Sequence, residues 1–282
     1  MSKRILSSLV GLVLLAVILA FYETIIFNFA IAVISVMAVY ELFVATGYIK
    51  EKSLSAICLL YAACFPFLNF PGLKNFTRPI MFVFVFALFV LMFRYYKRAN
   101  IQELALAYMV STLIPYSFST LLFIRNLSVA NGRFMILLAL GGAWLGDTGA
   151  YFIGTFFGKH KLCPKISPKK TVEGFIGGIL ATAIGFAVLG YVYYCYKSTD
   201  ANPIHINYVT LMITGALCSV LGVIGDLSAS MIKRQCKIKD FGNIMPGHGG
   251  VLDRFDSVLF TAPFMYILFS FSIETNLFTL IK

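Results

Sequence analysis

The sequence predicts an all-α integral membrane protein, a polytopic bundle of about nine transmembrane helices. The first observation behind this prediction is composition, because 60% of the residues are hydrophobic and 12% are charged. A soluble domain carries about 25% charged residues. The second is that apolar runs near twenty residues recur along the chain, the length needed to cross roughly 30 Å of hydrocarbon.

A window of about twenty residues, moved along the chain, predicts each element in turn. The first apolar run follows Lys3 and Arg4 like a signal peptide, but it has no clear A-x-A cleavage site and a second run follows almost at once. We therefore expect a retained first span. The predicted spans are 5–21, 25–45, 54–70, 79–96, 102–124, 134–156, 174–195, 208–232 and 257–278.

The distribution of basic residues predicts the orientation. With the amino terminus inside, 17 of the 23 Lys and Arg residues fall in cytoplasmic segments and 6 on the opposite side. The two longest polar loops, 157–173 and 233–256, then face the cytoplasm. We expect a multi-pass protein of the cytoplasmic (inner) membrane, with any polar site that these loops form on the cytoplasmic face.

Charge and cysteine usage exclude several classes of function. The net charge of +11 is not a nucleic-acid signal here, since such binding needs a basic face on a soluble surface. It fits basic cytoplasmic loops and sites for anionic lipid or phosphate. Six cysteines without a C-x-x-C pair support neither a disulfide framework nor a zinc site.

The acidic residues are few and unevenly placed. All six aspartates lie in the second half of the chain, and Asp147 and Asp226 fall inside predicted spans. A carboxylate there costs about 3 kcal/mol and faces a cavity or a partner, unless it snorkels near a helix end. We assign residues 1–135 as a scaffold of about five spans and 136–282 as the catalytic region. Glu41, Glu103, His160 and His205 are interpreted as structural, the two glutamates near interfaces.

The end of the eighth span carries a polar stripe. If the segment "GDLSASMIKRQCKIKD" is helical, steps of four, three and four align Asp226, Ser230, Lys233 and Lys237 on one face. An acid, a hydroxyl and two ammonium groups suit a metal ion with bound phosphates. The end of any span before a basic loop can look similar, so the stripe alone is moderately specific.

Two further segments each leave two interpretations open. In "GGAWLGDTGAYFIGTFFG", two G-x-x-x-G pairs favour close helix packing, which does not explain Asp147. In "KISPKKTVEG", Ser167, Lys169 and Lys170 offer a hydroxyl and ammonium groups to an anion. A solvated basic loop is the ordinary alternative, with Ser167 or Thr171 as a helix cap.

The segment "MPGHGGVLDRFDS", residues 245–257, gathers polar groups between two apolar runs. Glycines around His248 let backbone amides approach a ligand closely. Asp253 and Asp256 share a face if the ninth span begins there. Mg²⁺ prefers one or two carboxylates, water and phosphate oxygens, so Asp226 and Asp253 predict a magnesium seat, with Asp147 as a third candidate.

At these residues the sequence resembles the phosphatidate cytidylyltransferase family, also called CDP-diacylglycerol synthases. The family signature matches Ser230-Met-Ile-Lys233-Arg234, then Lys239-Asp240, and then His248-Gly-Gly-Val-Leu-Asp253-Arg254-Phe-Asp256. The "GDTGAY" and "SPKKTVEG" segments also look like upstream motifs of that family. The resemblance covers roughly residues 140–270.

The resemblance implies that CTP and phosphatidic acid give CDP-diacylglycerol and pyrophosphate, with Mg²⁺. The roles that we assign are hypotheses. Asp226 and Asp253 bind Mg²⁺, and Asp147 is a further ligand or an acid close by. A second cation beside Mg²⁺ stays open, as does the oligomeric state, for which a homodimer is one alternative.

The remaining roles concern the phosphates. The cations that hold the triphosphate or the phosphatidate headgroup are Lys233, Arg234, Lys239 and Arg254. The residues at the phosphate entrance are Ser167, Lys169 and Lys170, and Ser230 joins this substrate-binding set. We expect His248 to donate a hydrogen bond to the leaving pyrophosphate, and Asp240 and Asp256 to orient the cations.

Three alternatives remain. One is another CTP-dependent lipid enzyme, such as a CDP-archaeol synthase or a polyprenol or phytol kinase. The second is a transporter whose intramembrane acids carry ions, which explains Asp147 and Asp226 but not the polar cytoplasmic loop. The third is a purely structural membrane protein.

Overall fold

The computed structural model describes residues 2–47, 51–70, 72–97, 100–128, 130–198, 205–244 and 249–275. The prediction of an all-α membrane protein is confirmed. Within these ranges, seven helices are long and apolar enough to cross a membrane, and Val258–Ile273 forms a shorter apolar helix. The seven are Ile25–Thr46, Lys52–Asn69, Lys74–Arg94, Ile101–Leu127, Gly132–Phe157, Val172–Lys197 and Tyr208–Gln235. The total of nine spans stays a prediction.

The chain divides into two compact units, each built from two segments. Unit 1 comprises Met1–Phe123 and Lys233–Phe255, and unit 2 comprises Ile124–Ile232 and Asp256–Lys282. The boundary at Lys233 lies within helix α8, so the last residues of this helix belong to unit 1. The functional division of the sequence into 1–135 and 136–282 stays a prediction.

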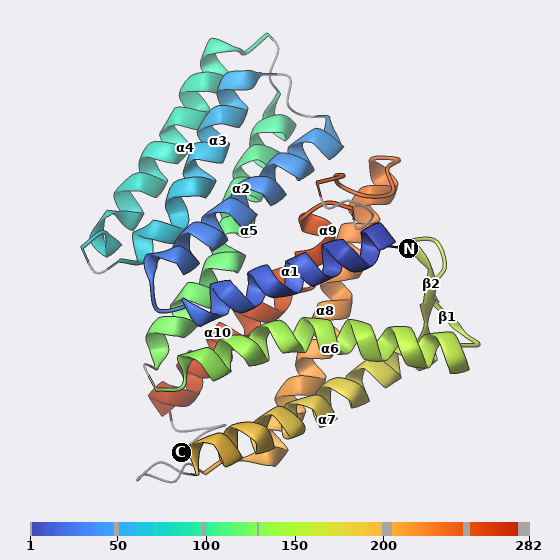
Figure 1. The fold of residues 1–282 in the computed structure, drawn as a ribbon. Coiled ribbons are helices and arrows are strands. Elements are labelled where there is room, and N and C mark those ends of the chain that lie inside the picture. Colours follow the sequence, from blue (N-terminus) through green and yellow to red (C-terminus); the bar gives the residue numbers. More distant parts are fainter. Residues whose placement is uncertain are drawn as a thin grey trace. The chain divides into compact units, whose positions relative to one another are not determined.

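Unit 1 is made of helices that precede Phe123, together with one short helix from the later segment. The elements are α1 (Ser2–Ala20), α2 (Ile25–Thr46), α3 (Lys52–Cys64), η1 (Phe65–Asn69), η2 (Lys74–Phe76), α4 (Thr77–Arg94), most of α5 (Ile101–Leu127), and α9 (Leu252–Phe255). Figure 1 shows α2, α3, α4 and α5 as neighbouring helices.

Local sequence explains where α2 begins and ends. The Thr24 side chain accepts a hydrogen bond from the Ile26 N–H, which caps the first turn. At the other end, Gly47 adopts φ 70°, a left-handed conformation that glycine reaches at low cost. The buried Asn28 amide donates to the Pro66 carbonyl at 2.8 Å and so ties α2 to η1.

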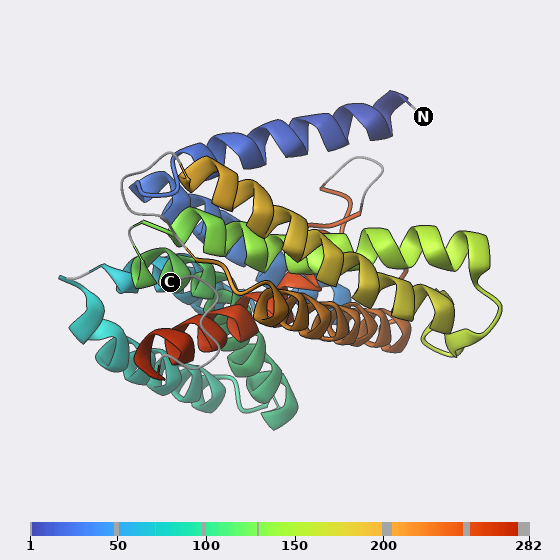
Figure 2. The same ribbon diagram turned by 90° about the horizontal axis from the view of Figure 1, so that it is seen from below.

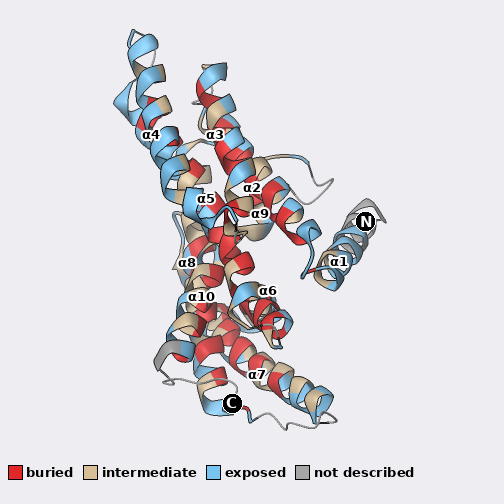
Figure 3. Cartoon of the chain, turned by 90° about the vertical axis from the view of Figure 1, so that its left-hand side faces the viewer, coloured by how far each residue is buried: buried red, intermediate tan, exposed pale blue. Residues whose placement is uncertain are grey.

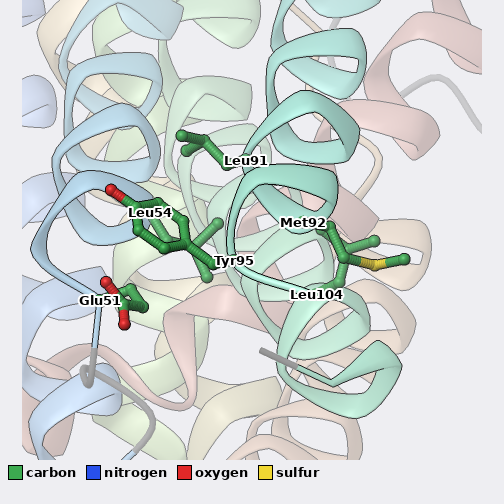
Figure 4. A pocket seen from close by; sticks show the side chains of 6 residues that line it. All are labelled: Glu51, Leu54, Leu91, Met92, Tyr95 and Leu104. Atoms are coloured by element: carbon green, nitrogen blue, oxygen red, sulfur yellow. The ribbon is translucent and has the colours of Figure 1, made fainter. Parts of the chain in front are cut away.

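The remaining helices of unit 1 differ in how much surface they bury. Tyr61 of α3 stacks on Phe84 of α4 with ring centroids 4.0 Å apart, but α4 otherwise exposes most of its apolar side chains (Figure 3). Figure 4 shows a small apolar pocket among α3, α4 and α5, near Leu54, Leu91 and Leu104. Its volume of about 10 Å³ is about the space that a single water molecule needs, so it is too small for a substrate.

Unit 2 contains a helical hairpin and two further helices. Its elements are α6 (Gly132–Phe157), β1 (Lys161–Cys163), β2 (Ser167–Thr171), α7 (Val172–Lys197), most of α8 (Tyr208–Gln235), and α10 (Val258–Thr275). Helices α6 and α7 lie side by side along their length, joined by the strand pair (Figures 1 and 2). At one end, Phe134 stacks on Tyr193 with ring centroids 4.1 Å apart.

Glycines let α6 approach α7 and α8 closely, as the G-x-x-x-G pairs predict. A Cβ atom added to Gly142 would lie 2.8 Å from the Cβ of Cys218 on α8. One added to Gly146 would lie 3.0 Å from the Ser219 hydroxyl. The packing interpretation is therefore confirmed at these two glycines, and it places Asp147 beside the crossing of α6 and α8.

Three details differ from the sequence interpretation. The segment "KISPKKT" does not form an open loop, because Ser167–Thr171 pairs antiparallel with Lys161–Cys163. Helix α8 ends at Gln235, and Lys237 adopts φ 56° beyond it, so Lys237 does not extend the helical stripe. Helix α10, in the region of the predicted ninth span, begins at Val258 after the separate short helix α9, so Asp253 and Asp256 do not share one continuous helix.

Candidate active site

Unit 2 contains a polar cavity between the helical hairpin and α8. Its volume is about 550 Å³, which is within the usual range for a small-molecule site. The predicted site residues that line it are Asp147, Ser167, Lys169, Lys170 and Asp226. Two segments that the sequence analysis treated separately, "GDTGAY" and "SPKKTVEG", therefore face the same space.

An ion pair joins the strand β2 to helix α8 at this cavity. The Lys170 ammonium lies 2.6 Å from Oδ2 of Asp226, and both side chains are largely buried. The other carboxylate oxygen of Asp226 accepts a hydrogen bond from the Ser230 hydroxyl at 3.3 Å. This bond confirms the predicted helical spacing of Asp226 and Ser230.

Asp147 on α6 faces the same cavity. The hydroxyl of Ser257 donates to Oδ2 of Asp147 at 3.2 Å. Asp147 also interacts electrostatically with Asp226 and Lys170. Two aspartates and three lysines (Lys161, Lys169 and Lys170) thus line the cavity, so its lining as a whole is not acidic.

The hairpin that carries Lys170 is fixed at its base by Glu173. The Glu173 carboxylate accepts hydrogen bonds from the backbone N–H groups of Lys159 at 3.0 Å and His160 at 3.2 Å. It also lies 2.6 Å from Nδ1 of His160. The Thr171 hydroxyl caps α7 by accepting from the Gly174 N–H, which confirms the cap interpretation for Thr171. The sequence did not predict the partner of His160.

Unit 1 holds a second polar cluster, around Asp253. The Lys233 ammonium lies 2.8 Å from Oδ1 of Asp253, and the side chains are 13% and 6% exposed. Oδ2 of Asp253 accepts hydrogen bonds from the backbone N–H groups of Phe241 at 2.8 Å and Gly250 at 2.9 Å. The Lys233 ammonium also lies 5.3 Å from the centre of the Phe241 ring, a cation–π distance.

The glycine that precedes Gly250 is required by this geometry. Gly249 adopts φ 85°, and a Cβ atom there would lie 2.9 Å from Oδ2 of Asp253. A side chain at this position would meet both backbone strain and a clash with the carboxylate. At Gly249 the group that the backbone approaches is the protein's own Asp253, and the predicted approach of these glycines to a ligand stays a prediction.

The other predicted site residues lie at different levels of exposure. Asp256 is buried in unit 2 and accepts a hydrogen bond from the Ser257 N–H at 2.8 Å. The predicted polar loop 233–256 also contains four exposed site residues, all in unit 1: Arg234, Lys239, Asp240 and Arg254. His248 lies outside the described residues. The roles assigned to all of these residues stay predictions.

The sequence did not predict the hydrogen bonds that Glu41 makes. Glu41 is only 2% exposed, and its carboxylate accepts hydrogen bonds from the Val251 and Leu252 N–H groups at 2.9 and 2.8 Å. The prediction that Glu41 lies near a membrane interface stays a prediction, but the structure adds backbone partners that the sequence did not indicate. The available signal was an acid within an apolar run, which marks a partner by default. Ser257, beside Asp147, was also missed.

The donor atoms in the unit 2 cavity suit a hard cation. Mg²⁺ takes one or two carboxylates and completes its shell with water and phosphate oxygens, and Asp147 and Asp226 offer two carboxylates to one cavity. Among the residues that the structure describes, no group of three or more His, Cys, Asp and Glu side chains could hold a metal ion. The prediction that Asp226 and Asp253 share one ion stays a prediction.

Comparison with known proteins identifies similar sequences. The model of the cytidylyltransferase family matches residues 2–272. A phosphatidate cytidylyltransferase of Bacillus subtilis (strain 168) is 41% identical over 167 residues, which cover 59% of this chain and 58% of that protein. The enzyme of the same name from Staphylococcus haemolyticus (strain JCSC1435) is 45% identical over 139 residues, covering 49% and 50%. The matches span about half the length of these relatives.

Proposed function

The chain belongs to the cytidylyltransferase family, and we propose that it is a phosphatidate cytidylyltransferase, which condenses CTP with phosphatidic acid to give CDP-diacylglycerol and pyrophosphate. The observation that carries this proposal is the identity of 41% and 45% to relatives of that name. Support also comes from a cavity that presents lysines and carboxylates together, as two phosphorylated reactants require.

The proposed reaction forms one P–O bond and breaks another. A phosphate oxygen of phosphatidic acid attacks the α-phosphorus of CTP, and the bond from that phosphorus to the pyrophosphate oxygen breaks. A phosphate monoester already carries close to two negative charges near pH 7, so its oxygen needs no strong general base. The main obstacle is repulsion between two anions, together with their alignment for in-line attack.

The chain's cations would reduce that repulsion. We propose that Lys170, with Ser167 and Lys169 beside it, binds phosphate oxygens in the unit 2 cavity. Because Lys170 is held by Asp226, its ammonium group is oriented before the anion arrives. Lys233, Arg234, Lys239 and Arg254 are proposed to bind the triphosphate or the lipid headgroup, with Ser230, Asp240 and Asp256 as polar supports and His248 as a donor to the pyrophosphate.

We propose Mg²⁺ as the cofactor, with Asp147, Asp226 and Asp253 as the carboxylates that would hold it. When bound, the ion would neutralise charge on the phosphate oxygens. The ion is tested by assaying the purified enzyme after chelation and with added Mg²⁺. Activity that is unchanged after complete removal of divalent cations would remove this part of the proposal. A second cation remains open.

The proposed location is the cytoplasmic membrane, with the amino terminus and the active site on the cytoplasmic side. Support comes from the 17 of 23 basic residues that this orientation places inside. A variant whose single cysteine is Cys163 should react with a membrane-impermeant thiol reagent only after cells are permeabilised. A matched variant with only Ser198→Cys should react in intact cells, and the reverse pattern would invert the topology.

The competing function is a lipid kinase that also uses CTP. Purified protein is given phosphatidic acid, or a polyprenol, with CTP labelled at either the α- or the γ-phosphate. We expect the α label to enter the lipid with phosphatidic acid as acceptor. Transfer of the γ label to a polyprenol would instead establish kinase chemistry. A homodimer and the exclusion of nucleic acid as a partner stay parts of the proposal.

A further inference from the structure

Glu41 connects the first half of the chain to the loop that holds Asp253. It lies on α2, 210 residues before Val251, yet both of its carboxylate oxygens are used by this loop. Oε1 accepts the Val251 N–H at 2.9 Å and Oε2 accepts the Leu252 N–H at 2.8 Å. The two bonds fix both the position and the orientation of that segment of backbone.

The surroundings of Glu41 are shaped around its carboxylate. A Cβ atom added to Gly242 would lie 2.6 Å from Oε1, and one added to Gly250 would lie 2.5 Å from both oxygens. Two glycines thus allow backbone from either side of the loop to close on one carboxylate. A charged group that is 2% exposed is costly inside an apolar helix, so such a group is usually tied to function.

The contacts of Glu41 lead directly to the Asp253 cluster. Gly250, which packs on the Glu41 carboxylate, donates its N–H to Oδ2 of Asp253. Phe241, the neighbour of Gly242, donates its N–H to the same oxygen. Glu41 and Asp253 therefore contact the same two stretches of backbone, residues 241–242 and 250–252.

We propose that Glu41 is a positioning residue for the Asp253–Lys233 pair. The Glu41 carboxylate binds the N–H groups of Val251 and Leu252, and the N–H of the adjacent Gly250 binds Asp253. Glu41 itself contacts neither substrate. The inference rests on the proposed function, because it assumes that Asp253 and Lys233 serve the transfer of the cytidylyl group. It also gives the amino-terminal helices a part in the chemistry beyond that of a scaffold.

The first test compares two buried glutamates of unit 1. Glu41→Gln keeps the size of the side chain but turns an NH₂ group toward one of the two N–H donors. Glu103→Gln is the matched control, because Glu103 is also buried, at 5% exposed, and its described hydrogen bond runs from its own backbone N–H to Asn100. We expect kcat to fall about 10- to 100-fold in Glu41→Gln, with a smaller change in KM for CTP, and to stay near wild type in Glu103→Gln.

A purely structural role would give a different pattern. If Glu41 only stabilised the fold, the lost activity would equal the lost fraction of folded protein in detergent, and kcat per folded molecule would not change. Glu41→Asp keeps the charge and both acceptors, so it should recover part of the activity that Glu41→Gln loses. Equal kcat in Glu41→Gln and Glu103→Gln, per folded molecule, would overturn the proposal.

A second test uses the glycine that packs on the carboxylate. Gly242→Ala should displace the Glu41 carboxylate, so kcat of the double variant Glu41→Gln/Gly242→Ala should be little lower than that of the less active single variant. If the fold-losses in kcat of the two single variants multiply in the double variant, the two effects are independent and the proposal is contradicted. Amide hydrogen exchange of residues 250–253 provides a readout without catalysis, and it should rise in Glu41→Gln but not in Glu103→Gln.

These readouts separate the two ideas. If the wild-type protein transfers no cytidylyl group to phosphatidic acid, the proposed function fails, whatever hydrogen exchange reports. If wild type is active and Glu41→Gln changes neither kcat nor exchange at residues 250–253, the positioning role of Glu41 fails by itself.

Discussion

The ammonium group of Lys170 lies 2.6 Å from the carboxylate of Asp226, so one strand residue of the hairpin is held against helix α8. The pair faces a cavity of about 550 Å³. A cation fixed by a carboxylate in this way is oriented in advance for an incoming anion, which is the condition for efficient electrostatic stabilisation of a transition state.

The first prediction concerns this lysine. Lys170→Gln should lower kcat by about 10²-fold, since one preorganised donor to the phosphates is removed. Lys165→Gln is the control, because Lys165 is an exposed residue of the same hairpin that the proposed site does not use. The measurement is incorporation of α-labelled CMP into lipid. Equal activities of the two variants would show that Lys170 has no role in the reaction.

The second prediction separates activity from stability at Asp253. Asp253→Asn should abolish transfer, and it should also destabilise the protein by about 3 kcal/mol, because the buried Lys233 ammonium loses its counter-ion. The double variant Lys233→Met/Asp253→Asn should regain much of the thermal stability while staying inactive. Thermal unfolding in detergent measures the first effect and the CMP assay the second. Transfer by either variant would remove Asp253 from the reaction.

The third prediction concerns the hydroxyl on Asp147. Ser257→Ala removes the hydrogen bond of 3.2 Å to Asp147, whose net contribution is about 1 kcal/mol. We expect a fall in kcat of several-fold, since the carboxylate is less well oriented. Thr261→Val serves as the control, because the Thr261 hydroxyl, on α10 in the same unit, bonds the Ala139 carbonyl instead. An equal decrease in both variants would point to general destabilisation.

The fourth prediction tests the packing of α6 with two adjacent glycines. Gly142→Ala would place a Cβ atom 2.8 Å from Cys218, whereas at Gly141 the nearest atom would be 3.7 Å away. Gly142→Ala should therefore lower the free energy of unfolding by about 1–3 kcal/mol. Gly141→Ala should be neutral or slightly stabilising, since alanine favours helix by up to about 1 kcal/mol over glycine. Unfolding in detergent measures both, and equal stabilities would contradict this account of the packing.

Features that depend on neighbours in the sequence were predicted well. The helix positions follow from apolar runs, and the contact between Ser230 and Asp226 follows from their separation of four residues. The predicted span 208–232 ends close to the observed end of α8 at Gln235. The continuation of the helical stripe to Lys237 was wrong, because "RQCKIKD" contains neither glycine nor proline to mark the end of the helix. Lys237 adopts the left-handed conformation there instead, which is uncommon for a residue with a side chain.

Contacts between residues far apart in the sequence could not be predicted from the sequence alone. The bond from Val251 to Glu41 joins residues 210 apart, and no local pattern records it. The strands β1 and β2 were also missed, because Pro168 and three lysines do not favour a strand. Strand preference depends on pairing and surroundings more than on the residues themselves, and here Pro168 sits on a sheet with only two strands.

The anchoring of the hairpin by Glu173 limits how the cavity can adapt. Glu173 lies in the first turn of α7, and its carboxylate accepts hydrogen bonds from the N–H groups of Lys159 and His160. The chain before β1 is therefore held against the chain after β2, and the two have little freedom to separate. Under the proposed function, reactants of different size or charge would then be accommodated mainly by rotation about the side-chain bonds of the exposed Lys169, because Lys170 is held by Asp226. A long, flexible ammonium group on a stiff support would allow that adjustment without displacement of the main chain.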